Sequence, residues 1–370
     1  MKIGINATCF NNRPSGARQR FIGLYGTLFK KLPSVEFTIY EPRDCNIYEW
    51  FPAADNIKYI KTIIPSEGRV KKFIYSLIFW HKELRIKKYD IFEGSHLPFF
   101  KLKNAYNIIT IHDLRDLQPN ANIIIKILYK ITMNIAMSNV QHVITVSEIV
   151  KNELLQIYPN KKISVIYNGL NSQEKISINL ENKINFQDKY QLKENFLLTV
   201  GHFEKRKNYD NLIKALYILK KQDESYKLVI IGNDSGEMNN IKKLIIIKNL
   251  QNNIIIINGL TDLEVKCAFN LCSAFIFPSL YEGFGIPVVE AMKAERPLIL
   301  SDIPVFREIT EEKLFYFNAK DPNSIVYYIR KIMNDENLKN KIINYGKIRF
   351  KDFNYEELAV KQMNIYFKIK

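Results

Sequence analysis

A strand, a glycine loop and a helix start follow one another between Ala274 and Ser301, and this junction constrains the fold more than any other stretch. Residues 274–277 are all apolar and predict a buried strand, and residues 282–285 read Glu-Gly-Phe-Gly. Pro287 suits the first position of a helix, and Arg296-Pro297 should end that helix. A loop in this position faces the positive end of a helix dipole, which favours a phosphate group. The simpler alternative is a turn between strand and helix with no ligand.

Two carboxylates flank this loop, Glu282 before it and Glu290 in the first turn of the predicted helix. Paired carboxylates can cleave a glycosidic bond, but their spacing along the chain neither sets nor excludes the distance that a hydrolase needs. Glu290 could equally serve the dipole of its own helix.

The segment Glu-Gly-Phe-Gly-Ile-Pro-Val-Val-Glu, residues 282–290, resembles the E-x7-E signature of glycosyltransferase family 4, whose members are retaining enzymes with the GT-B fold. Other features of that family recur in the expected order, and together they span nearly the whole chain: Gly16, His112-Asp113, Val146-Ser147, Asn168-Gly169, Gly201, Arg206-Lys207-Asn208 and Ser301-Asp302-Ile303-Pro304.

This resemblance implies an α/β protein with two facing Rossmann-like domains and a cleft between them. It implies a retaining, metal-independent transfer of a hexose from a nucleotide-diphospho-sugar to a hydroxyl of a growing, lipid-linked polysaccharide of O-antigen or capsule type. The segment around residues 301–308 is similar to mannosyltransferase-like members, which favours GDP-mannose. The implied catalytic residues are Glu282 and His112. The implied donor-binding residues are Gly16, Arg206, Lys207, Gly283, Phe284, Gly285 and Glu290.

The charge and the chain position of these residues are compatible with the implied roles. Arg206 and Lys207 follow a predicted strand at 196–200, where two cations could neutralise a diphosphate, although a solvated basic turn is the alternative. His112 follows the predicted strand 107–111, at the edge where parallel sheets place ligands. No Asp-x-Asp triplet occurs in the sequence, so no carboxylate pair for a metal is evident and we expect no cofactor.

Strands alternate with helices throughout the chain, which predicts parallel sheets. We place an N-terminal acceptor domain at residues 1–178 and a C-terminal nucleotide-sugar domain at residues 179–352. A polar, weakly periodic stretch from 171 to 194 is interpreted as the linker. Residues 353–370 should form a helix that returns to the first domain, as the resemblance implies.

Charge and hydrophobic pattern suggest a membrane surface as a partner. The formal net charge is +16, of which residues 1–178 carry +11. Residues 69–88 interleave seven basic residues and one acid with apolar residues, and positions 73, 77, 80 and 84 share one helical face. This fits a helix lying on anionic lipid. It also fits an amphipathic core helix with a solvated basic face, and the basic composition could be mere genomic bias. Residues 121–138 are a weaker second candidate.

We therefore expect a cytoplasmic protein, peripheral on the inner face of the cytoplasmic membrane. Met1-Lys2 leads directly into a strand pattern with no signal peptide, and no apolar run of about 18 residues could span a bilayer. No nucleic-acid-binding motif is present. The alternative function is a noncatalytic nucleotide-sugar or polyanion-binding protein of the same fold.

Overall fold

The computed structural model describes residues 1–12, 15–83, 88–119, 121–170, 178–192, 195–224 and 226–369. The chain divides into two compact units. Unit 1 comprises residues 1–171 and 354–370, and unit 2 comprises residues 172–353. The domain boundaries predicted from the sequence follow residues 178 and 352. In the structure, the two units are divided after residues 171 and 353.

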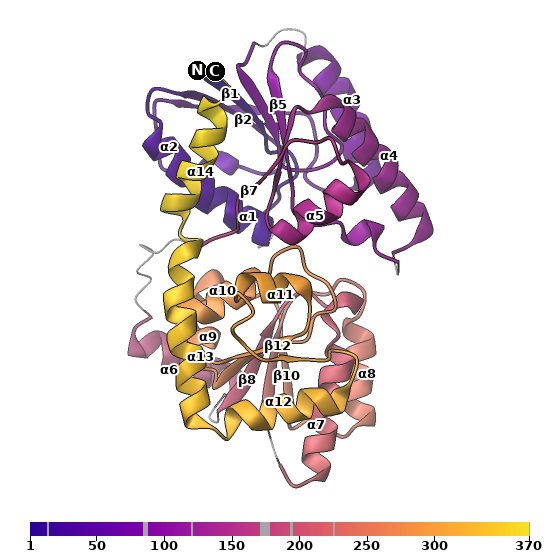
Figure 1. Ribbon diagram of the computed structural model, residues 1–370, viewed down its shortest axis with the longest axis vertical. Helices are drawn as coiled ribbons and strands as arrows, with labels where there is room; N and C mark the ends of the chain where they lie inside the picture. Colours follow the sequence, from indigo (N-terminus) through magenta and orange to yellow (C-terminus); the bar gives the residue numbers. More distant parts are fainter. Residues whose placement is uncertain are drawn as a thin grey trace. The chain divides into compact units, whose positions relative to one another are not determined.

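Unit 1 is built on a seven-stranded parallel sheet of order β3-β2-β1-β4-β5-β6-β7 (Figure 1). Its strands and helices, in chain order, are β1 (Lys2–Asn6), α1 (Gly16–Arg20), the π-helical η1 (Phe21–Tyr25), α2 (Gly26–Lys31), β2 (Glu36–Glu41), β3 (Ile57–Lys61), α3 (Arg69–Glu83), β4 (Ile91–Gly94), β5 (Tyr106–Ile111), α4 (Ile123–Asn139), β6 (His142–Thr145), α5 (Glu148–Ile157), β7 (Ile163–Val165) and α14 (Tyr355–Phe367). Strand patterns at residues 2–6, 89–93, 107–111, 142–146 and 163–166 predict β1 and β4 to β7, whereas β2 and β3 were not predicted.

Successive residues of each central strand enter different hydrophobic cores on the two faces of this sheet. Ile108 of β5 packs with η1, α2 and α14, whereas its neighbour Ile109 packs with α3 and α4. Ile144 and Val143 of β6 divide in the same way. A strand that is buried on both faces needs apolar residues at every position, which explains the continuous apolar runs in the sequence.

The C-terminal helix α14 is part of unit 1 because its side chains enter the sheet. Glu93 of β4 is fully buried. It accepts hydrogen bonds from the Tyr366 hydroxyl at 2.5 Å and from Gln362 Nε2 at 3.3 Å. Burial raises the pKa of Glu93 above its ordinary value. These bonds satisfy a carboxyl group that would otherwise be costly to bury.

Unit 2 contains a six-stranded parallel sheet of order β10-β9-β8-β11-β12-β13. Its strands and helices, in chain order, are α6 (Leu180–Tyr190), β8 (Phe196–Val200), the 3-10 turn η4 (Lys205–Lys207), α7 (Tyr209–Lys221), β9 (Lys227–Ile231), α8 (Met238–Ile247), β10 (Ile254–Ile257), α9 (Asp262–Leu271), β11 (Ala274–Phe277), α10 (Ile286–Lys293), β12 (Leu298–Ser301), α11 (Pro304–Ile309), β13 (Tyr316–Phe317), α12 (Pro322–Met333) and α13 (Glu336–Arg349).

Part of the predicted linker is a helix of unit 2. Residues 171–177 and 193–194 lie outside the described residues, but α6 lies between them and contacts α9. Phe186 is the buried anchor of α6, and both Lys189 and Tyr190 bond Glu264 of α9. The prediction was wrong there because the helix buries one residue only, and most of its other residues are polar.

The residues of the apolar face predicted for 69–88 do not share one environment in the structure. Phe73 and Leu77 are exposed, but Trp80 is fully buried among Tyr40, Phe79 and Phe92. Leu84 lies among residues 84–87, which are not described. Within the described residues, none of the helices has the length and apolar character that a membrane span requires.

Gly23 provides a test of how α14 packs on unit 1. A Cβ atom at this position would lie 2.0 Å from Cε2 of Tyr355, the first residue of α14. We expect Gly23→Ala to lower the free energy of unfolding by about 1–3 kcal/mol, the usual cost of overpacking. Urea denaturation measures the change.

Gly26, one helical turn later, is the matched control. A Cβ there would meet Phe51 at an ordinary 3.6 Å. Gly26→Ala should leave stability unchanged or raise it by up to about 1 kcal/mol. Equal stability of the two variants would contradict the packing described here.

Candidate functional site

The glycine loop of unit 2 lies between β11 and α10 and has the predicted strand, loop and helix order. Gly285 occupies the position before the helix with a φ of 114°, a conformation that favours glycine. A Cβ there would also meet Phe306 at 2.9 Å. Pro287 lies in the first turn of α10, at the second position rather than the predicted first. The loop is therefore held against α11.

Two cations reach the same place from the turn after β8. Arg206 and Lys207 lie in the 3-10 turn η4, and the Arg206 carbonyl accepts a 2.8 Å bond from Leu280 N. Gly201 leaves room for the lysine, because a Cβ on it would lie 2.8 Å from Lys207 Cε. The ring of Phe277 lies 4.5 Å from the ammonium nitrogen, a cation–π contact.

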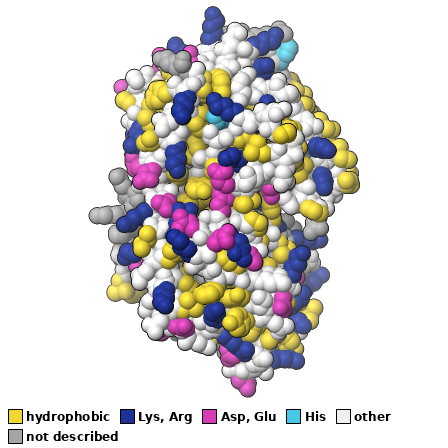
Figure 2. All heavy atoms as spheres, in the orientation of Figure 1, with side chains coloured by type: hydrophobic (Ala, Val, Ile, Leu, Met, Phe, Trp, Pro, Cys, Tyr) yellow, Lys and Arg dark blue, Asp and Glu magenta, His cyan; other side chains and the backbone are white. Residues whose placement is uncertain are grey.

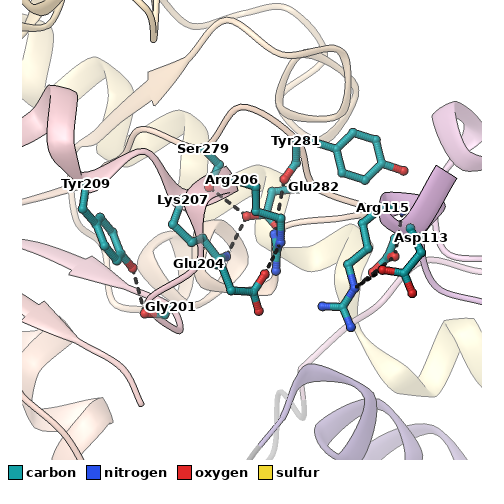
Figure 3. A network of polar contacts seen from close by, with 11 residues as sticks. Asp113, Arg115, Gly201, Glu204, Arg206, Lys207, Tyr209, Ser279, Tyr281 and Glu282 are labelled. Carbon is teal, nitrogen blue, oxygen red and sulfur yellow. Dashed lines mark hydrogen bonds and ion pairs between the residues drawn. The ribbon is translucent and has the colours of Figure 1, made fainter. Parts of the chain in front are cut away.

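Glu282 binds both cations (Figure 3). Lys207 Nζ lies 2.6 Å from Glu282 Oε1, and Arg206 Nη1 lies 2.6 Å from Oε2. Glu204 holds the other side of the guanidinium, with 2.6 Å between Arg206 Nε and Glu204 Oε2. The sequence predicts Glu282, Arg206 and Lys207 as site residues, and the structure brings them together. We call these four residues, Glu204, Arg206, Lys207 and Glu282, the charge cluster.

Electrostatics keep Glu282 ionised despite its burial. Burial by itself raises the pKa of this carboxyl, but the cations of Lys207 and Arg206, with hydrogen bonds from Lys207 and Ser279, outweigh it and lower the pKa to about 2. Glu282 and Lys207 are 9% and 6% exposed, whereas the Arg206 side chain is 23% exposed. The formal charges of the cluster sum to zero, and its cationic groups contact the loop that precedes α10.

Three polar residues that the sequence analysis did not assign to the site hold the loops in place. Ser279 Oγ donates to Glu282 Oε1 at 2.8 Å, and Ser301 Oγ donates to the Ser279 carbonyl at 2.6 Å. Asn208 Nδ2 donates to the carbonyls of Pro278 and Ala319 at 3.0 and 2.7 Å. Asparagine is a common N-cap residue, but the side chain of Asn208 makes no cap bond to α7. Ser279 and Ser301 could have been found, because both lie at carboxyl ends of predicted adjacent strands.

The remaining predicted donor-binding residues of unit 2 lie in the loop before α10 and in α10 itself. Gly283 and Phe284 are buried in the loop, and the Phe284 ring lies 5.7 Å from that of Phe353, edge to face. Glu290 is half-buried and is the fifth residue of α10, so it lies one turn later than the predicted first turn. No three or more His, Cys, Asp or Glu side chains among the described residues are grouped as a metal site would require.

Gly16 and His112 belong to unit 1. Gly16 is the exposed first residue of α1, and the Ser15 hydroxyl accepts a 3.2 Å bond from Arg18 N to cap that helix. His112 directly follows β5. Burial lowers the pKa of His112 to about 3, with a smaller effect from the Arg20 cation. The imidazole is therefore neutral near pH 7 and can both donate and accept a hydrogen bond.

Comparison with known protein families matches both units. The family described as Glycosyltransferase Family 4 matches residues 35–174, and Glycosyl transferases group 1 matches residues 181–349. The O-antigen chain mannosyltransferase RfbU of Salmonella typhimurium (strain LT2) is 32% identical over 218 residues, which is 58% of this chain and 58% of RfbU. The match thus spans less than two thirds of that relative.

Solved structures share the fold across nearly the whole chain. WaaG, a glycosyltransferase involved in lipopolysaccharide biosynthesis, superposes with a TM-score of 0.76 at 12% identity, covering 98% of this chain and 99% of WaaG. Anabaena HepE in complex with UDP-glucose superposes with a TM-score of 0.73 at 16% identity, covering all of both chains. The two parallel-sheet units therefore have the Rossmann-like architecture of GT-B glycosyltransferases.

The depressed pKa of Glu282 predicts how its contribution to stability depends on pH. Because its pKa is about 2 in the folded chain and 4.5 ordinarily, the contribution is fully present above about pH 4.5 and is lost as the pH falls toward 2. At pH 7, Glu282→Gln should lower the free energy of unfolding by about 3–5 kcal/mol, because Lys207 is left buried without its counter-charge.

Urea unfolding of wild type and Glu282→Gln from pH 7 down to pH 3.5 tests this pH dependence. The difference in their free energies of unfolding should become smaller below about pH 4.5. Glu312→Gln, whose side chain is 72% exposed, is the control and should change stability by less than about 0.5 kcal/mol. If Glu282→Gln had the same free energy of unfolding as wild type at pH 7, or if the difference grew as the pH fell, Glu282 could not be ionised in the folded chain as described.

Proposed function

Because the chain belongs to glycosyltransferase family 4, we propose that it is a retaining hexosyltransferase that uses a nucleotide-diphospho-sugar. GDP-mannose is the proposed donor, and a hydroxyl of a lipid-linked polysaccharide precursor of O-antigen type is the proposed acceptor. The likeness to RfbU, an O-antigen chain mannosyltransferase, supports the sugar and the acceptor class. The likeness to HepE, solved with UDP-glucose, supports a nucleotide-sugar donor in general.

The charge cluster is the observation that carries this proposal. Arg206 and Lys207 approach each other at the carboxyl edge of a parallel sheet, where such folds bind ligands. Glu282 holds both cations from one side, so their positions are fixed before a ligand arrives. In the proposed complex, diphosphate oxygens bind the two cations and the positive end of α10, and no metal ion is needed. Preorganised donors of this kind contribute about 3–4 kcal/mol each to lowering a barrier.

The roles of the other residues follow from the family resemblance and remain part of the proposal. Glu290 accepts hydrogen bonds from the ribose hydroxyls, and Glu282 orients the donor sugar while it fixes the cations. His112, neutral near pH 7, hydrogen-bonds a sugar hydroxyl, and Gly16 lets the chain approach the donor. The acceptor hydroxyl attacks the face from which the nucleotide departs, and a phosphate oxygen of the leaving group takes its proton.

We further propose that the protein works at the inner face of the cytoplasmic membrane, bound peripherally to anionic lipid. A lipid-linked acceptor is available only at a bilayer surface. The basic helix α3, which covers the described part of residues 69–88, supports this location.

Transfer activity gives the first test. Glu282→Gln keeps the size of the side chain and removes its charge, so both cations lose their shared partner. We expect kcat/KM to fall by about a hundredfold or more, the effect of losing one preorganised contact. The measurement is release of GDP from GDP-mannose on addition of a lipid-linked acceptor, at a temperature where the variant is folded.

Glu312→Gln is the control and should retain full activity. Full activity in Glu282→Gln would exclude the proposed role, and GDP binding without any turnover in wild type would favour the noncatalytic alternative.

Donor identity is tested by thermal unfolding in the presence of GDP-, UDP-, dTDP- and ADP-sugars. A ligand at 100 times its dissociation constant stabilises the native state by about 2.7 kcal/mol, enough to raise the midpoint measurably. We expect GDP-mannose to give the largest shift. If another nucleotide sugar gave a larger shift, that sugar would be assigned as the donor in place of GDP-mannose. If none of them raised the midpoint, nucleotide-sugar binding would be contradicted.

A further inference from the structure

Helix α4 of unit 1 exposes a row of large aliphatic side chains. Ile127 is 52% exposed and Ile131 is 50% exposed. The full row also includes four further residues with similar or greater exposure, namely Ile123, Ile124, Leu128 and Ile135. They recur at helical spacing, while Met133, Ala136 and Met137 on the other side of α4 enter the core. A row of exposed aliphatic side chains of this length is typical of an interaction site.

Helix α3 presents a second row beside it. Its exposed apolar residues are Val70, Phe73, Ile74, Leu77 and Ile78. Both helices cover the same face of the sheet, because Trp80 of α3 and Met133 of α4 lie in one core cluster. Figure 2 shows apolar side chains along the edge of unit 1 where Figure 1 places α3 and α4. The outward sides of the two helices therefore form one surface, which we call the α3–α4 surface.

The charges on this surface have one sign. Helix α4 carries Lys126 and Lys130 and no acidic residue, and α3 carries Lys71, Lys72 and Lys82 with Glu83 as its only acid. Glu83 accepts a 3.2 Å hydrogen bond from the Tyr40 hydroxyl, which belongs to the core. None of Lys71, Lys82 and Lys130 forms an ion pair within the described part of the chain. Lysines beside an aliphatic row complement a surface with anionic groups above an apolar layer.

We propose that the α3–α4 surface lies in the interface of an anionic bilayer, with the isoleucines of α4 among the acyl chains and the lysines on the headgroups. This inference rests on the peripheral location proposed above and makes it more specific. It assigns much of the apolar contact to α4, which residues 69–88 do not include. It also removes Trp80 from the contact, since that ring is in the core.

Vesicle binding tests the proposal. The probes are vesicles of phosphatidylcholine alone and of phosphatidylcholine mixed with phosphatidylglycerol, and binding is measured by cosedimentation of the full chain. Two apolar variants, Ile127→Ser/Ile131→Ser on α4 and Ile74→Ser/Ile78→Ser on α3, should each weaken binding to the anionic vesicles about tenfold or more. Lys126→Glu/Lys130→Glu should weaken it on anionic vesicles, and added salt should reduce this charge effect.

Helix α8 of unit 2 offers a matched control. Ile246 and Ile247 are 58% and 72% exposed, so Ile246→Ser/Ile247→Ser removes isoleucines that are at least as exposed as Ile127 and Ile131 but lie outside the α3–α4 surface. This variant should bind vesicles as wild type does. Circular dichroism confirms the fold of each variant, and binding of GDP-mannose, measured by calorimetry, should be the same in all of them.

Three outcomes would overturn the inference. Wild type could fail to sediment with anionic vesicles, or the α4 variant could bind them as well as wild type. Light scattering could also show that the α4 variant abolishes a dimer while vesicle binding is unchanged, which would make the surface a contact with a second copy. Retained binding of GDP-mannose in any of these cases would leave the proposed donor site intact.

Discussion

The buried pairing of Glu282 with Lys207 and Arg206 is the interaction on which the candidate site depends. A lysine ammonium that is almost fully buried is costly unless a counter-charge and hydrogen bonds compensate it. Much of the local architecture provides that compensation. Gly201 leaves the space for the lysine, Gly285 takes the left-handed backbone conformation with which α10 begins, and Ser279 donates a further hydrogen bond to the carboxylate. The cations are therefore fixed by the protein alone.

The parts of unit 2 that were predictable are those in which local sequence and tertiary position agree. Four apolar residues, a glycine loop and a proline at the helix start specify β11 and α10 with little help from the rest of the chain. Arg206, Lys207 and Glu282 could be assigned because the family resemblance implies them and each lies in a loop that follows a predicted strand. Glu204 could not be assigned in the same way, because its role depends on which loop it faces after folding.

The errors have physical causes of the same kind. Helix α6 buries Phe186 alone, so its composition resembles a linker. Strands β2 and β3 lie at one edge of the sheet, and the burial of β3 is only partial, so its pattern is weak. Trp80 shares a helical face with exposed residues in the sequence, yet a cluster with Tyr40 and Phe92 buries it. In each case contacts with distant parts of the chain decide the outcome, and periodicity does not contain them.

Calorimetric titration with GDP, in EDTA and then in magnesium, tests most directly whether Arg206 and Lys207 receive the diphosphate without a metal. We expect wild type to bind GDP equally well in both, and Lys207→Met, which keeps a side chain of similar length, to bind it at least about tenfold more weakly. Binding that requires magnesium, or that is unchanged in Lys207→Met, would contradict metal-free binding of the diphosphate by these two cations.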